Sequence, residues 1–289
     1  MKPRCPLCNN DRQCPSWLGI RRFRGQDYRW ARCTDCGSSY YDPMPDDAVL
    51  GGIYGVDYLN VNQSADVPGS PKDHHWVIRE LRRRPPGVFI DYGCGAGDLL
   101  EKAAKIPWDV RGVELNEDVA HRVELAIGLP VTSRPESLAD AGGKPSADVI
   151  HAGDVIEHFG HLDQEIDRVL ALLKPGGLLM AQGPLLSGSC LFNLVYQTAG
   201  RLRTGRIIEA TPTHLVASTR TGIQKLIERR KLDLIEFRIS EVAWPGPWRW
   251  ESHPKAAALF ALRRLSQYVS RLDPRRLGNR YQFAAVKPS

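Results

Sequence analysis

The fold of this chain is decided by the stretch Val88-Phe89-Ile90-Asp91-Tyr92-Gly93-Cys94-Gly95-Ala96-Gly97. Apolar strand-forming residues lead into a glycine-rich turn, and a helix-forming run over 98–105 follows. A doubly wound sheet binds a nucleotide-like ligand at such a turn. The glycine pattern here is G-x-G-x-G, whereas a dinucleotide fingerprint, G-x-G-x-x-G, would need its third glycine at Asp98. No Gly-Lys-Ser/Thr follows, which excludes a phosphate-binding P-loop.

Outward from this turn, strand and helix signals alternate along the chain. Further strands are predicted over 110–114, 147–151, 178–181, 232–239 and 280–286, and helices over 98–105, 118–127, 163–173, 219–230 and 254–272. This alternation predicts an α/β fold, a doubly wound Rossmann-like parallel sheet that is covered by helices on both faces. Residues 185–205 interrupt it with an apolar and then basic insertion, in which no strand is predicted before the helix near Thr219.

The amino-terminal region carries two C-x2-C pairs separated by 24 residues. Four thiolates at this spacing close a tetrahedral Zn²⁺ site and leave no position for a reactive water, so we predict a structural metal. A redox or metal-free role is the alternative. The chain has seven cysteines, an odd number that argues against a closed disulfide framework. The predicted zinc ligands are Cys5, Cys8, Cys33 and Cys36.

These signals divide the chain into three parts. We predict a zinc ribbon over 1–45, a linker over 46–72 and the main domain over 73–289. Within the main domain, 185–215 is predicted to be a lid over the acceptor, and 254–275 a basic amphipathic helix, because apolar residues recur at helical spacing with arginines between them.

Charge is unevenly distributed over the 289 residues, whose formal net charge is +6. Lys and Arg exceed Asp and Glu at both ends of the chain, which leaves an acidic middle. Basic ends suit a polyanion such as RNA, a phosphate-bearing or lipid-linked acceptor, or a membrane surface reached through the carboxyl-terminal basic helix. Solvated arginines are the alternative. Neither an apolar signal core nor an apolar run of about 20 residues is present, so we expect a cytoplasmic protein.

With its surroundings, the turn resembles the first motif of class I S-adenosylmethionine-dependent methyltransferases. The resemblance implies that Gly93, Gly95 and Gly97 let the cofactor lie against the backbone, and that Asp91 helps to hold its methionine end. Glu114 ends the next predicted strand, where a carboxylate accepts hydrogen bonds from both ribose hydroxyls. A solvent-facing loop acid is the alternative for Glu114.

Two later segments, 148–159 and 172–177, resemble the fourth-strand and fifth-strand blocks of the same superfamily. The amino-terminal cysteine pairs, with the aromatic and proline residues that follow them, resemble a zinc module joined to methyltransferases of bacterial sugar and polysaccharide modification. One departure stands out: an acidic or Asn residue usually meets the adenine amino group after the third strand, but the segment 132–136 here reads Thr-Ser-Arg-Pro-Glu and no residue is assigned to that contact.

Methyl transfer to a hydroxyl needs a base, and an imidazole titrates in the right range. His158 and His214 are the candidates, His214 because its segment resembles the one that lines the acceptor pocket in related enzymes; either histidine could instead be structural. Asp154, Glu157 and His158 also resemble a D/E-x2-E-H cluster that binds a divalent ion in some quinone-pathway O-methyltransferases. Alternatively, Asp154 caps a helix. We also place Asp154 at the cofactor site.

The sequence therefore predicts a zinc-ribbon methyltransferase that uses S-adenosyl-L-methionine and structural Zn²⁺. Its predicted acceptor is a hydroxyl of a sugar, or of a glycolipid or polysaccharide intermediate. One alternative is an RNA methyltransferase that holds RNA with the basic ribbon. Another is a non-enzymatic scaffold that only binds the cofactor.

Overall fold

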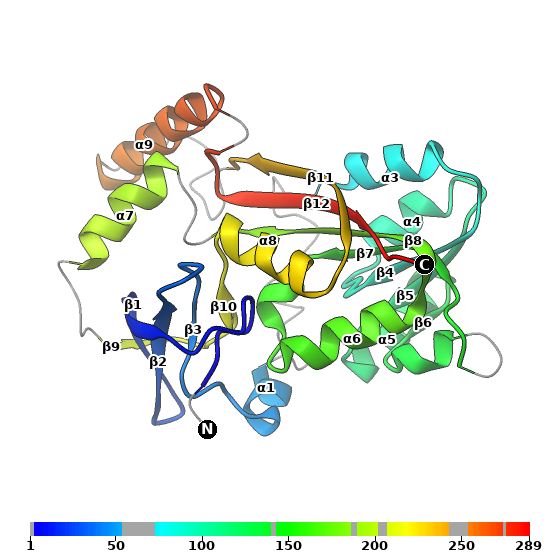
Figure 1. Cartoon of the computed structure of the whole chain (residues 1–289), viewed down its shortest axis with the longest axis horizontal. Coiled ribbons are helices and arrows are strands. Elements are labelled where there is room, and N and C mark those ends of the chain that lie inside the picture. Colours follow the sequence, from blue (N-terminus) through cyan, green and yellow to red (C-terminus); the bar gives the residue numbers. More distant parts are fainter. Residues whose placement is uncertain are drawn as a thin grey trace.

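The computed structural model describes residues 3–53, 73–139, 143–185, 190–201, 207–242, 254–273 and 276–289. Its larger sheet has seven strands, in the order β11-β12-β8-β7-β4-β5-β6 (Figure 1). In chain order the strands are β4 (Val88–Tyr92), β5 (Asp109–Val113), β6 (Val131–Thr132), β7 (Ala147–Gly153), β8 (Leu173–Pro184), β11 (Asp233–Ser240) and β12 (Arg280–Val286). The predicted α/β fold is confirmed.

The sheet is mixed, so the expectation of a wholly parallel sheet is wrong at one strand. β12 runs antiparallel to both of its neighbours, β8 and β11. The five strands from β8 to β6 are parallel, with Ile90 opposite Arg111 on one side and Ile150 on the other. β12 is the last strand in the chain, but in the sheet it lies between β8 and β11. The residue pattern of β12 does not encode this placement.

Helices cover both faces of this sheet. Phe89 packs on one side with α3 (His74–Arg82), α4 (Asp98–Ala103) and α5 (Glu117–Ile127). Ile90, the next residue along β4, packs on the other side with α6 (Leu162–Leu172) and α8 (Arg220–Arg229). Successive side chains of a strand point to opposite faces, so this short apolar strand is buried on both faces of the sheet.

The smaller sheet joins the amino-terminal module to a distant part of the chain. Its order is β10-β3-β2-β1-β9, in which β1 (Gln13–Phe23), β2 (Gln26–Cys33) and β3 (Ser39–Tyr41) form antiparallel pairs. β9 (Ile207–Glu209) pairs with β1, and β10 (Val216–Ala217) pairs with β3. No strand was expected between residue 185 and the helix near Thr219. These two short strands form because the module supplies their partners.

Three helices lie outside the layers around the larger sheet. α1 (Asp47–Ile53) follows the ribbon, and α7 (Leu191–Arg201) packs against α9 (Pro254–Ser270), beyond the edge of the larger sheet in Figure 1. The described residues also include two short 3-10 helices, η1 (Pro135–Leu138) and η2 (Ile156–His158). Most of the predicted linker lies outside the described residues. Among the helices that are described, none is long and apolar enough to cross a membrane.

The amino-terminal module is held tightly against α8. Thr219 caps this helix by accepting a hydrogen bond from Gly222 N at 3.0 Å, and its hydroxyl donates to the Cys36 carbonyl at 2.7 Å. Arg229, at the other end of the helix, donates to the Pro6 carbonyl at 2.8 Å. Gly222 lies so close to the ribbon that an added Cβ would come within 2.8 Å of Leu7 Cδ1. The ribbon and the main domain therefore share one core.

Candidate active site and cysteine cluster

The glycine turn lies between the ends of β4 and β5. Gly93 N donates to the Val113 carbonyl at 2.7 Å, and Gly97, with a φ of 87°, begins α4 in a conformation that favours glycine. Gly95 N donates to Glu114 Oε2 at 3.2 Å. The predicted ribose-binding carboxylate is therefore beside the glycine turn, at the carboxyl edge of the parallel strands. This edge is where a doubly wound sheet binds its ligand.

Asp91 has a partner that the sequence did not indicate. Its carboxylate accepts a hydrogen bond from His151 Nδ1 at 2.7 Å, and both side chains are almost wholly buried. His151 Nε2 accepts from the Gln182 side-chain amide at 2.9 Å, since an amide nitrogen only donates. The three residues come from the adjacent strands β4, β7 and β8. No local spacing links them, so only strand pairing reveals this network.

Asp154 follows β7 in a left-handed conformation, with a φ of 54°. Its carboxylate accepts a hydrogen bond from Arg280 at 2.6 Å, in a pair that is largely buried. η2 follows Asp154 and has Val155 at its capping position, with no side-chain cap, so the expectation that Asp154 caps a helix is wrong. The strand β12 supplies the arginine, which explains why the local sequence suggested a cap instead.

Glu157, His158 and His214 form a second cluster at the same edge. Their ligand-type atoms lie within 4.8 Å of one another, and the two imidazole rings are 4.9 Å apart between centroids. Glu157 is 2% exposed, and no hydrogen-bond partner for its Oε2 is found among the described residues. The structure thus groups Glu157 and His158 with His214. Asp154 is held by Arg280 instead.

Hydrogen bonding and burial set the protonation of this cluster. His158 Nδ1 lies 2.8 Å from the Thr213 carbonyl, which only accepts, so Nδ1 carries a proton and the neutral ring keeps a lone pair on Nε2. Desolvation, and then the charge of His158, lower the pKa of His214 to about 4. Burial, and then the charge of Asp154, raise the pKa of Glu157 to about 7.

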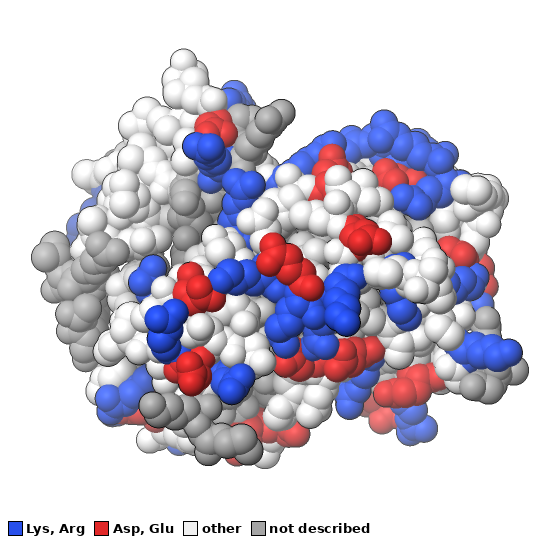
Figure 2. Space-filling model, in the orientation of Figure 1, with Lys and Arg blue, Asp and Glu red and all other residues white. Residues whose placement is uncertain are grey.

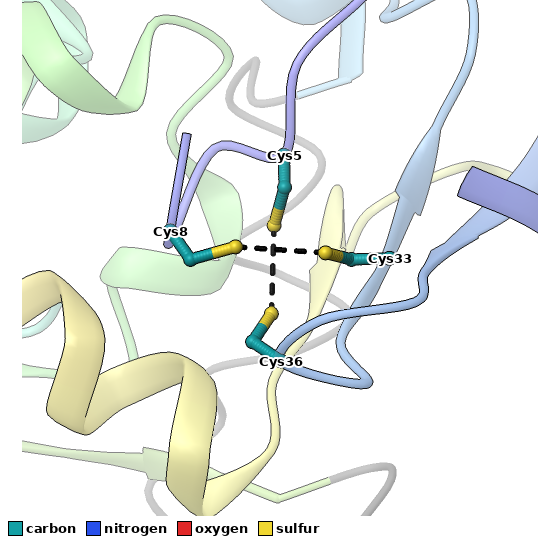
Figure 3. Close-up of side chains that lie close together, drawn as sticks. All are labelled: Cys5, Cys8, Cys33 and Cys36. Atoms are coloured by element: carbon teal, nitrogen blue, oxygen red, sulfur yellow. Dashed lines mark hydrogen bonds between the residues drawn. The ribbon is translucent and has the colours of Figure 1, made fainter. Parts of the chain in front are cut away.

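The four predicted zinc ligands converge from two loops (Figure 3). Cys5 and Cys8 precede β1, whereas Cys33 ends β2 and Cys36 lies in the turn to β3. The Sγ atoms of Cys5 and Cys36 are 3.6 Å apart, and those of Cys8 and Cys33 are 3.5 Å apart. Zinc–sulfur bonds of about 2.3 Å in a tetrahedron require a spacing of about 3.8 Å. The geometry is compatible with a zinc ribbon, and hydrogen bonding by Cys5 lowers the pKa of Cys36 to about 5.

This sheet order, with the glycine turn and an acidic residue at the end of the next strand, defines an α/β enzyme of the nucleoside-binding class. Residues 74–286 match the family described as "Methyltransferase domain", and the chain belongs to this family. The family match bears out the class I S-adenosylmethionine-dependent methyltransferase domain that the glycine turn predicted.

Curated relatives resemble one part of the chain. The Ubiquinone biosynthesis O-methyltransferase of Chelativorans sp. is 36% identical over 97 residues, which are 32% of this chain and 38% of that protein. The Brucella ovis enzyme of the same name is 35% identical over the same length. The chain thus matches little more than a third of these relatives. A Burkholderia thailandensis 1,6-didemethyltoxoflavin-N1-methyltransferase structure is 15% identical, covers 89% of this chain and 99% of that one, and shares the fold at a TM-score of 0.52.

Proposed function

We propose that this enzyme methylates a hydroxyl oxygen and that His158 is the base. S-adenosylmethionine supplies an electrophilic methyl group, and Glu114 with the glycine turn fits its nucleoside. One observation carries the assignment of the base: the Thr213 carbonyl holds the Nδ1 proton of His158, which leaves Nε2 as the proton acceptor. The exposed fraction of the His158 side chain is 16%, and we propose that the acceptor approaches this exposed part.

His214 and Glu157 have supporting roles in this proposal. With a pKa near 4, His214 is neutral at pH 7 and a weak base. Its role in this proposal is to pack beside His158 as a wall of the acceptor site. Glu157 Oε1 lies 4.0 Å from His158 Nε2, and above the Glu157 pKa of about 7 the ionised carboxylate favours the imidazolium that forms when the hydroxyl proton arrives. Binding of a divalent ion by Asp154, Glu157 and His158 stays a prediction.

Two variants test the base. His158→Ala should lower kcat roughly 10²- to 10⁴-fold, the range for a lost general base, and should leave the dissociation constant of S-adenosylmethionine unchanged. His214→Ala should lower kcat less, because it removes only a neighbouring ring. Calorimetry and single-turnover kinetics separate the two effects. If His158→Ala keeps near-normal turnover, or if His214→Ala loses more, the assignment fails.

We propose that the acceptor hydroxyl belongs to a sugar, or to a glycolipid or polysaccharide intermediate. The resemblance of the amino-terminal module to that of sugar-modifying methyltransferases supports this choice. A second candidate is a hydroxyl of an intermediate in ubiquinone biosynthesis, which is favoured by the 36% identity over 97 residues to a Ubiquinone biosynthesis O-methyltransferase. Both candidates are hydroxyl acceptors and use the same base.

The RNA alternative stays a prediction. The ribbon side visible in Figure 2 carries Lys and Arg interspersed with Asp and Glu, and the denser basic group in this view lies over α3. Transfer of labelled methyl groups to sugar nucleotides, glycolipids, catechol-type phenols and total RNA distinguishes the candidates, with Glu114→Ala as the control for cofactor-dependent signal. Labelling of RNA alone would reject the hydroxyl acceptors named above.

We further propose that Zn²⁺ on the four cysteines gives the module a role in the active site. β3 follows the second cysteine pair, and β10 pairs with it immediately after His214. Leu215 N then donates to the Glu157 carbonyl at 2.7 Å. Folding of the module therefore positions the segment that holds His158. Removal of the metal should lower kcat more than it weakens cofactor binding, because the glycine turn belongs to the other sheet.

A further inference from the structure

α9 exposes a continuous apolar stripe. Ala258, Ala261, Leu265, Tyr268 and Leu272 are separated by three, four, three and four residues, which places them on one side of a helix. All five are exposed, and the three large side chains are exposed by 53%, 64% and 73% in chain order. At 1.5 Å per residue the stripe is about 21 Å long. Leu272 lies in the turn that directly follows the helix.

The opposite side of α9 carries three buried polar residues, the first of them one turn after the exposed Leu259. Arg263, Ser266 and Ser270 are exposed by 4%, 0% and 5%, and the Ser270 hydroxyl donates to the Glu241 carboxylate. A surface helix normally turns its apolar side to the core and its polar side to water. This helix does the reverse, and the polar contacts beneath it hold the apolar stripe outward.

The charged side chains from 254 to 272 are all basic, and the acidic Asp273 directly follows the stripe. Lys255, Arg264 and Arg271 are exposed, and the sequence from 254 to 272 contains no Asp or Glu. α7 packs against α9 and adds two exposed apolar side chains, Leu194 and Val195. The two helices lie together at one end of the molecule in Figure 1. Apolar groups flanked by basic groups match the boundary between the headgroups and acyl chains of an anionic bilayer.

We propose that α9, with α7 beside it, binds the surface of a membrane that contains anionic phospholipid. The stripe enters the headgroup region, and the arginines contact lipid phosphates. Pairing with the same stripe of a second copy would bring basic groups together without an acidic partner from α9, so charge favours the lipid. The inference concerns binding alone and does not rest on the acceptor, because it needs no turnover.

Vesicle flotation with the full-length, zinc-loaded protein tests this proposal. The wild type should float with vesicles of mixed phosphatidylglycerol and phosphatidylcholine, and should bind phosphatidylcholine alone much more weakly. Leu265→Ser, Tyr268→Ser and Leu272→Ser in one chain should lower the partition coefficient roughly tenfold or more, because the buried methylene groups are lost. Leu125→Ser is the matched control, since that leucine is 71% exposed on α5 and should change nothing.

A second variant separates charge from apolar contact. Arg264→Gln with Arg271→Gln should lower partition to the anionic vesicles about thirtyfold, because each basic residue near such a surface contributes about 1 kcal/mol and two are removed. Circular dichroism and thermal unfolding confirm that each variant is folded. Equal flotation of the wild type and the triple variant overturns the proposal. The proposal is also overturned if neither protein floats and light scattering shows that the wild type is a dimer whereas the triple variant is a monomer.

Discussion

Glu157→Gln offers a test of the buried cluster in which the direction of the effect is fixed by physical chemistry. The Glu157 carboxyl is buried beside Asp154, and its pKa is raised from an ordinary value near 4.5 to about 7. Between these values the unfolded chain has released the proton while the folded protein keeps it, so folding loses stability as pH rises. The stability that depends on protonated Glu157 is fully present below pH 4.5 and is lost once the pH passes about 7.

The magnitude follows from the same shift. One pKa unit corresponds to about 1.4 kcal/mol, so the whole shift corresponds to about 3 kcal/mol, most of which falls between pH 5 and pH 8. A glutamine side chain cannot ionise, so this part of the pH dependence should be absent from the Glu157→Gln variant. Relative to the wild type, the variant should therefore gain about 2 to 3 kcal/mol of unfolding free energy between these two pH values.

Urea unfolding at pH 5 and pH 8, with zinc present throughout, measures this difference. The comparison cancels contributions that both proteins share, including those of the thiolates. Glu101→Gln is the matched control, because Glu101 lies exposed on α4 and should follow the wild type at both pH values. Parallel curves for wild type and Glu157→Gln would refute the reasoning, since they would mean that Glu157 ionises equally in the folded and unfolded states.

Three further changes probe the fold and the cofactor site. The wild type should hold one zinc ion per chain, and Cys33→Ser should lose this ion and unfold the ribbon. Metal analysis and circular dichroism measure both effects, and a variant that kept its zinc would contradict the prediction. Glu114→Ala should weaken S-adenosylmethionine binding by about 1.5 to 3 kcal/mol in calorimetry, and NAD should not bind; unchanged affinity would show that the carboxylate does not hold the ribose. Gly222→Ala should lower the unfolding free energy by about 1 to 3 kcal/mol, because its Cβ meets the ribbon, whereas Gly51→Ala, with open space around it, should be nearly neutral in the same thermal unfolding experiment.

Local signals were sufficient for the central layers of the fold. The strand at 88–92, the glycine turn and α4 are contiguous, and each is specified by residues within a few positions of one another. The placement of Glu114 beside the turn also followed from the sequence, because consecutive parallel strands end at the same edge. The domain boundaries and the roles of the site residues stay predictions.

Other features depended on segments that are distant in the sequence. β9 and β10 are two- or three-residue strands that exist because β1 and β3 pair with them. Asp91 meets His151 across two strands, and Asp154 meets Arg280, 126 residues later in the chain. Short strands and buried polar pairs contribute too little local pattern to be recognised before their partners are known.

The sequence by itself determined the strand-turn-helix unit, the alternation of strands and helices and the four cysteines, because each is encoded by periodicity or by fixed spacing. Only the tertiary structure decided that β12 inserts antiparallel, that His214 joins His158, and that α9 turns its polar side inward. The pattern of α9 shows an apolar stripe, but not which way the stripe faces. That direction depends on the groups beneath the helix, and here Glu241 binds Ser270 and so orients the polar side toward the protein.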